Sequence, residues 1–226
     1  MVRAASLYLD GCGFEPHHPY QKTKRFFEMI TDIRVYSRQS MERLASEGRT
    51  SGFPFFGVTW HLVSIHGRSK QFLTPSVIKT LEGFGMSRSI SLDFWDITDN
   101  PELIDALKKE KSDYILFSDS QAEDVVKFMN DRKAESSSDV LICHCDAGVS
   151  RSGAVGTFAC EFFGLDYKKF CSDNPYVSPN LMVLRMLRTT AGTGGPTAFM
   201  TAFEAEAARK RKKSDEFAVK YAHLFV

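Results

Sequence analysis

The amino-acid sequence predicts an α/β domain in which a central sheet is flanked by helices. The middle of the chain alternates short runs of strand-forming residues with helical segments that carry capping signals, a pattern typical of layered α/β folds. No internal repeat and no long Pro-, Gly- or Ser-rich linker divides the sequence. Its 226 residues fit one domain with elaborations, so we expect residues 1–226 to form a single domain.

Three segments in the middle of the chain are expected to be strands. Residues 58–65 and 88–94 are rich in strand-forming side chains, and residues 139–144 form a short apolar run typical of a buried strand. A further strand is expected at residues 33–36, followed by a short helix capped by Ser40. Residues 48–52, bounded by glycines, are expected to form a loop.

The helices are predicted from their termini. Proline at the first helical position marks two starts, at Thr74-Pro75 and at Asn100-Pro101. Residues 120–123 form a candidate capping box, with apolar residues following at helical spacing. The remaining helices are expected from Ser150-Arg151 to Gly164, from Ser178-Pro179 to Thr190, and over 197–226, where the basic run 209–213 interrupts the pattern.

Composition limits the functional classes without naming one. The 29 Lys and Arg residues almost balance 28 Asp and Glu residues, which argues against a chain that as a whole coats nucleic acid or an anionic membrane. No segment approaches the roughly 18 apolar residues that a membrane span needs, and the N-terminus lacks the apolar run of a secretory signal. The five cysteines are odd in number and irregularly spaced, so we expect a reducing, cytoplasmic location.

The most informative stretch of the sequence is 143–153, Cys-His-Cys-Asp-Ala-Gly-Val-Ser-Arg-Ser-Gly. A predicted buried strand leads into this stretch and a predicted helix follows it. Cys145 and Arg151 are six positions apart, His144 precedes the cysteine, and Gly148 and Ser152 complete the pattern. By average residue frequencies, this combination arises by chance in a chain with five cysteines on the order of once in 10⁴.

The chemistry of this stretch suits a phosphate dianion. Backbone N–H groups that turn inward at a helix N-terminus concentrate partial positive charge, and the same field stabilises a thiolate, which makes Cys145 a candidate nucleophile. The planar guanidinium of Arg151 can hold two phosphate oxygens. Ser152 can donate a hydrogen bond to the sulfur, and His144 is expected to organise the loop. The residues expected to bind phosphate are Asp146, Ala147, Gly148, Val149, Ser150 and Arg151.

This His-Cys-x5-Arg-Ser pattern resembles the phosphate-binding loop of the cysteine-based protein tyrosine phosphatase superfamily, on its dual-specificity side. The order of predicted strands and helices is similar from about residue 58 to 190, and the segments 37–44 and 178–185 resemble compact microbial or viral members. The resemblance implies a central, mostly parallel sheet and hydrolysis of phosphotyrosine through a phosphocysteine intermediate. Residues 1–30 and the C-terminal helix 197–226 lie outside it, as elaborations.

The family's reaction also uses an aspartic acid on a loop to protonate the leaving oxygen. Register with the family's acid loop favours Asp96, whereas Asp93 falls inside a predicted strand. Asp99 is the alternative acid, although it also suits a helix cap before Pro101. The separation between Asp96 and Cys145 exceeds the family's usual spacing, which predicts an insertion at 101–117 near the rim of the site.

Alternatives for substrate and role remain open. The loop lacks the lysines of phosphoinositide-directed relatives, which favours a phosphorylated protein as substrate, on phosphotyrosine alone or on phosphoserine and phosphothreonine as well. The rivals are an RNA 5′-phosphatase or triphosphatase and a phospho-binding module without turnover. The basic run 209–213 is expected to be a solvated face, with RNA docking as the less favoured alternative. We expect neither a metal nor a cofactor, and core or loop roles for Cys143, Cys160 and Cys171.

Overall fold

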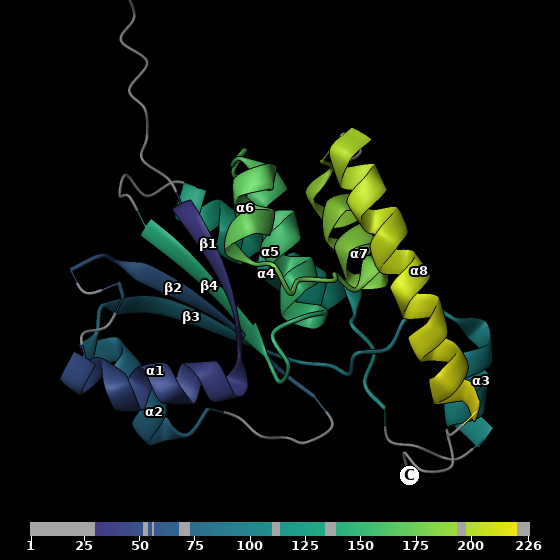
Figure 1. Cartoon of the computed structure of the whole chain (residues 1–226), viewed down its shortest axis with the longest axis horizontal. Coiled ribbons are helices and arrows are strands. Elements are labelled where there is room, and N and C mark those ends of the chain that lie inside the picture. Colours follow the sequence, from purple (N-terminus) through teal and green to yellow (C-terminus); the bar gives the residue numbers. More distant parts are fainter. Residues whose placement is uncertain are drawn as a thin grey trace, which may run out of the picture.

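The computed structural model describes residues 30–51, 54–55, 57–67, 73–109, 114–133, 139–193 and 198–220. The N-terminal extension at 1–29, which includes Cys12, His17 and His18, lies outside the described residues. A four-stranded sheet in the order β1-β4-β2-β3 forms the centre of the fold, and all its neighbouring strands are parallel (Figure 1). The strands are β1 (Ile30–Ser37), β2 (Trp60–His66), β3 (Met86–Asp93) and β4 (Asp139–Cys145).

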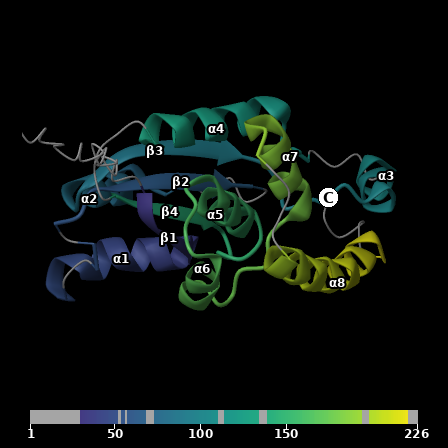
Figure 2. The ribbon, with the colours of Figure 1, turned by 90° about the horizontal axis from the view of Figure 1, so that it is seen from above.

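Helices cover both faces of this sheet. The helices of the described residues are α1 (Arg38–Ser51), α2 (Pro75–Gly83), α3 (Pro101–Lys109), α4 (Asp119–Lys133), α5 (Arg151–Phe162), α6 (Tyr167–Asp173), α7 (Leu181–Ala191) and α8 (Ala198–Lys220). Figure 2 shows α4 and α1 on opposite sides of the sheet. The prediction of an α/β fold with a mostly parallel sheet flanked by helices is therefore confirmed.

The two central strands are buried along their whole length, as their apolar sequences predict. Alternate residues of β4 point to opposite faces, so the strand contributes to two separate cores. Leu141 and Cys143 pack with residues of α4, α5 and α7, whereas Val140 and Ile142 pack with Trp60 and residues of α1 and α2. Packing on both faces of the sheet thus fixes the position of β4 and the direction in which the chain leaves the sheet at Cys145.

Several helix boundaries differ from the prediction because neighbouring side chains compete for the same cap. Ser37, not Ser40, caps α1, since its Oγ accepts the Ser40 N–H at 3.1 Å. The helix then continues to Ser51, through the predicted loop at 48–52. Ser118 rather than Ser120 forms the capping box of α4, because it exchanges backbone and side-chain hydrogen bonds with Gln121. The short helix α6, capped by Asp166, was not predicted.

The helix of the predicted insertion, α3, and the C-terminal helix, α8, lie beside each other past the edge of the sheet. α3 and α8 share a small core of Ile97, Leu103 and Leu107, against which Ala218 and Val219 of α8 pack. Figure 1 shows both helices at the end of the sheet toward which the strands point. That edge is where the carboxyl ends of parallel strands gather and where α/β proteins bind ligands. Within the described residues, no helix is long and apolar enough to cross a membrane.

Candidate active site

The candidate site is built on the turn between β4 and α5. Cys145 ends the strand and Arg151 begins the helix, and residues 146–150, which we call the phosphate loop, connect them. The Cys145 sulfur lies 3.3 Å from the backbone nitrogen of Gly148, which donates to it, and 3.1 Å from the Ser152 hydroxyl oxygen. The Cys145 side chain is almost fully buried, at the edge of the apolar core that includes Cys143. The pattern found in the sequence therefore corresponds to one compact loop around a thiol.

Gly148 is required by the loop's geometry. Its φ of 70° lies in the left-handed region, which side chains disfavour. A Cβ at this position would also overlap the backbone of Tyr36 and Ser37, at the end of the adjacent strand β1. The absence of a side chain thus allows the loop to approach the sheet closely enough for the Gly148 N–H to reach the sulfur.

Two backbone carbonyls and one carboxylate hold the Arg151 side chain in place. Its Nη1 donates to the backbone carbonyls of His66 and Phe94, at 2.6 and 3.0 Å, and its Nη2 donates to the Asp146 carboxylate at 2.7 Å. Gly67 leaves room for this arrangement, because a Cβ there would overlap the guanidinium. These contacts fix the plane of the guanidinium at the carboxyl ends of β2 and β3. Asp146 was predicted to bind phosphate, and in the structure its carboxylate pairs with Arg151.

A polar cluster lies beneath the phosphate loop. The Ser64 hydroxyl contacts Nε2 of both His144 and His66, at 2.7 and 3.0 Å. Burial, and then the neighbouring His66, lower the pKa of His144 to about 4. His144 is therefore neutral at physiological pH and is engaged with the sheet. This arrangement suits the loop-organising role expected for it.

Asp96 lies at the end of the phosphate loop, on the segment 94–100 between β3 and α3, which we call the acid loop. The Ser150 hydroxyl donates to its Oδ1 at 2.8 Å, Asn180 donates to the same oxygen at 2.9 Å, and Arg211 lies 3.1 Å from Oδ2. Partial burial acts to raise the pKa of Asp96, but the charge of Arg211 and these hydrogen bonds outweigh it, so the pKa lies below its ordinary value. Asp96 is thus held at the site as a carboxylate.

The other two acid candidates lie elsewhere. Asp99 pairs with Arg185 at 2.6 Å, with both side chains more than half exposed. Asp93 ends β3, as expected from the sequence, and its carbonyl accepts a hydrogen bond from Gln121. Of these three carboxylates, the structure brings Asp96 to the phosphate loop.

Two residues of the site were missed by sequence reasoning. Asn180 caps α7 through its Oδ1 and uses its Nδ2 to hold Asp96 and the Ile97 carbonyl. An asparagine before an apolar helical run is a recognisable cap. No pattern in the sequence around Asn180 indicates its second contact, with Asp96. Arg211 belongs to the basic run that was expected to be solvated, and it is 115 positions from Asp96.

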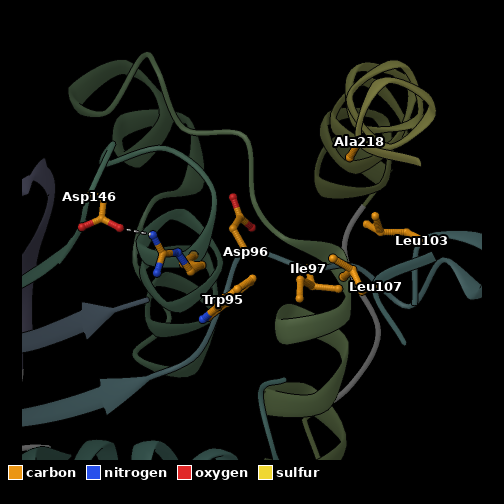
Figure 3. A pocket seen from close by; sticks show the side chains of 8 residues that line it. Trp95, Asp96, Ile97, Leu103, Leu107, Asp146 and Ala218 are labelled. Atoms are coloured by element: carbon orange, nitrogen blue, oxygen red, sulfur yellow. Dashed lines mark hydrogen bonds and ion pairs between the residues drawn. The ribbon is translucent and has the colours of Figure 1, made fainter. Parts of the chain in front are cut away.

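A pocket of about 290 Å³ opens between the phosphate loop and the two outer helices (Figure 3). Asp146, Arg151 and Asp96 provide its polar end. The opposite wall is apolar and combines acid-loop, α3 and α8 side chains. In Figure 3, Asp96 lies between Asp146 and the apolar side chains Ile97 and Leu107. The apolar lining residues are Trp95, Ile97, Leu103, Leu107 and Ala218.

No protein-family model matches the chain, and no curated protein matches it. Among solved structures, the chain is similar to the active form of Tk-PTP, with 13% identity over 82% of this chain and 93% of that one and a TM-score of 0.34. It is also similar to human DUSP28, with 16% identity, 71% and 91% coverage and a TM-score of 0.34. The human tyrosine phosphatase-like serine/threonine/tyrosine-interacting protein is similar at 17% identity, with 66% and 87% coverage and a TM-score of 0.32.

Proposed function

We propose that the protein hydrolyses phosphomonoesters through a phosphocysteine intermediate. The observation that carries this proposal is the placement of the Cys145 sulfur within reach of the Gly148 N–H and the Ser152 hydroxyl, at the start of a helix that begins with Arg151. The Gly148 N–H, the Ser152 hydroxyl and the N-terminus of α5 stabilise a thiolate at Cys145. Together with the Arg151 guanidinium, the N-terminus of α5 also favours a bound phosphoryl group. The same groups stabilise the charge that develops on phosphorus-bound oxygens.

In the first step, the Cys145 thiolate attacks phosphorus as the bond to the leaving oxygen breaks. Arg151 and the loop amides hold the other phosphoryl oxygens, and the leaving oxygen takes a proton from Asp96. In the second step, a water attacks phosphorus and gives its proton to the Asp96 carboxylate. The sulfur leaves as a thiolate and again accepts hydrogen bonds from Gly148 and Ser152, and inorganic phosphate is released.

The pocket favours a substrate with an aromatic body. Trp95, Ile97 and Leu103 form an apolar wall next to the polar end, which suits a phosphotyrosine ring better than a ribose or an inositol ring. We therefore propose phosphotyrosine in a protein as the main substrate, with phosphoserine and phosphothreonine as further candidates. A thiolate nucleophile also requires reducing surroundings, so we place the activity in the cytoplasm.

The proposal is tested by turnover of the full-length protein. We expect hydrolysis of p-nitrophenyl phosphate in the presence of EDTA, and faster release of phosphate from phosphotyrosine peptides than from phosphoserine or phosphothreonine peptides. A large preference for 5′-triphosphate RNA would contradict the substrate assignment. Tight binding of phosphopeptides with no hydrolysis of any ester at any pH would instead identify a phospho-binding module.

The role of Asp96 is tested by its dependence on the leaving group. We expect Asp96→Asn to lower kcat/KM for phenyl phosphate about 10²-fold, because the phenolate needs a proton to leave. The loss on p-nitrophenyl phosphate is expected to be much smaller, since nitrophenolate leaves without one. Asp99→Asn is the matched control, because Asp99 lies in the same loop and pairs with Arg185 instead. If Asp99→Asn shows the leaving-group effect and Asp96→Asn does not, the acid is Asp99.

A further inference from the structure

The helix α8 reaches the acid loop through two residues one turn apart. Arg211 approaches Asp96 by both ends of its guanidinium: Nη1 lies 3.1 Å from Oδ2 and Nη2 donates to the Asp96 backbone carbonyl. Nη1 also donates to the Ser150 hydroxyl at 3.2 Å. A single side chain of α8 therefore bridges the acid loop and the end of the phosphate loop.

Asp215 supports Arg211 and holds the next part of the acid loop. Its Oδ1 lies 3.3 Å from Nε of Arg211, and its Oδ2 accepts the Thr98 hydroxyl at 2.8 Å. Both Asp215 and Thr98 are buried, so this contact is shielded from solvent. Nη1 and Nη2 of the planar guanidinium form hydrogen bonds here, and Nε lies within ion-pair distance of Asp215, so the Arg211 side chain is held on more than one side.

The other cations of the basic run behave differently. Arg209 and Lys210 pair with Glu206 on the surface of α8, with side chains about two-thirds exposed. Lys212 and Lys213 are exposed as well. The side chain of Arg211 is 22% exposed and lies against the site. The run is therefore a solvated face, as predicted, except at the one position that faces inward.

We propose that Arg211 is a positioning residue for the proposed acid, Asp96: it ties the acid loop to the end of the phosphate loop and keeps a cation beside the carboxylate. The inference rests on the proposed function. It assigns to α8, which lies outside the part of the chain that resembles phosphatases, a direct part in placing the proton donor. Asp96 is then held next to the position at which the leaving oxygen points out of the phosphate loop. The acid loop does not have to change its conformation before the proton is transferred.

Burial acts to raise the pKa of Asp96, and among the charged groups around it Arg211 has the largest effect and lowers that pKa. From α8, this carboxyl group is faced by Arg211, with Asp215 behind. Asp146 of the phosphate loop and Arg151 at the start of α5 also face it, and they pair with each other. α7 contributes the neutral Asn180 at its start, while its Arg185 is engaged with Asp99. The cation that positions Asp96 also lowers the pKa of Asp96, so this carboxyl group carries its proton only at lower pH.

The pH profile separates this role from a purely structural one. In full-length Arg211→Met, we expect the basic limb of kcat/KM for phenyl phosphate to move to higher pH, since the carboxylate loses its neighbouring cation. Below that limb, the rate is expected to fall about 10-fold because the acid loop is less well held. Arg211→Lys keeps a charge but not the bridging geometry. The basic limb of its kcat/KM profile should therefore lie between the limbs of the wild type and of Arg211→Met. Lys213→Met, an exposed cation of the same run, is the control and should follow the wild type.

A second measurement needs no turnover. In a Cys145→Ser background, the Asp96 carboxyl carbon can be followed by NMR during a pH titration and assigned by its loss in Asp96→Asn. We expect its pKa to rise in Arg211→Met and to stay unchanged in Lys213→Met. An unchanged Asp96 titration in Arg211→Met would overturn the inference. An absence of hydrolysis with the expected titration shift would instead contradict the proposed function and leave the contact to Arg211 supported.

Discussion

Replacing Cys145 by serine is expected to lower kcat for every phosphoester by about 10⁴-fold or more, because it removes the proposed nucleophile and keeps the contacts of Arg151. The serine hydroxyl is nearly isosteric but is not ionised near neutral pH, so it cannot attack phosphorus at a comparable rate. Arg151 does not depend on the sulfur for its position, since its contacts are to His66, Phe94 and Asp146. Phosphopeptide binding should therefore persist, which makes the variant a substrate trap.

Cys171→Ser is the informative control for this loss. Among the four cysteines that the structure describes, Cys171 is half-buried, whereas Cys143, Cys145 and Cys160 are buried. Of these four, Cys171 is the thiol that would react through exposure alone. Burial also raises the pKa of the Cys171 thiol, which makes it a poor nucleophile. Single-turnover kinetics with acid quench should show a phosphorylated intermediate in Cys171→Ser and none in Cys145→Ser. A phosphoenzyme in Cys145→Ser would move the nucleophile elsewhere.

The local part of the site could be predicted from sequence because it is contiguous. The strand, the phosphate loop and the start of α5 occupy 139–151, so the spacing of Cys145, Gly148 and Arg151 alone specifies which groups can meet. Asp96 was predicted differently, through the register of a predicted strand with the family's acid loop, and the structure places it beside Ser150. Its placement depended on β2 and β4 bringing β3 to the same edge of the sheet, which the alternation of strands and helices already indicated.

The contacts that hold Asp96 could not be predicted in this way. Asn180 is 84 positions from Asp96 and Arg211 is 115 positions from it, and both depend on how α7 and α8 pack. The basic run offered no means of choosing among its five cations, because the inward position is set by α8 packing on α3 through Ala218 and Val219. The predictions that Ser40 and Ser120 cap helices were wrong for a local reason. In each case another serine two or three positions away takes the cap.

Arg151→Lys is expected to lower kcat/KM about 10³-fold while the protein remains folded. A lysine keeps the positive charge, but its ammonium is a point donor and cannot hold two phosphoryl oxygens in one plane as the guanidinium does. The three groups that fix Arg151 also make the position demanding: the His66 and Phe94 carbonyls and the Asp146 carboxylate converge on two nitrogens of one planar group. An ammonium would satisfy some of these acceptors only by turning away from the bound phosphoryl group.

Arg185→Lys is the matched control, since Arg185 makes an exposed ion pair with Asp99 outside the pocket, and exposed pairs contribute little to stability. The measurements are kcat/KM for p-nitrophenyl phosphate, inhibition by vanadate, and the thermal midpoint of each variant. We expect Arg151→Lys to lose vanadate affinity together with rate, because both depend on holding equatorial oxygens around phosphorus or vanadium. If Arg151→Lys stays within about 10-fold of the wild type in rate, the charge alone suffices and the planar grip assigned to Arg151 is wrong. If it loses rate but keeps vanadate affinity, Arg151 orders the loop rather than holding the transferred group.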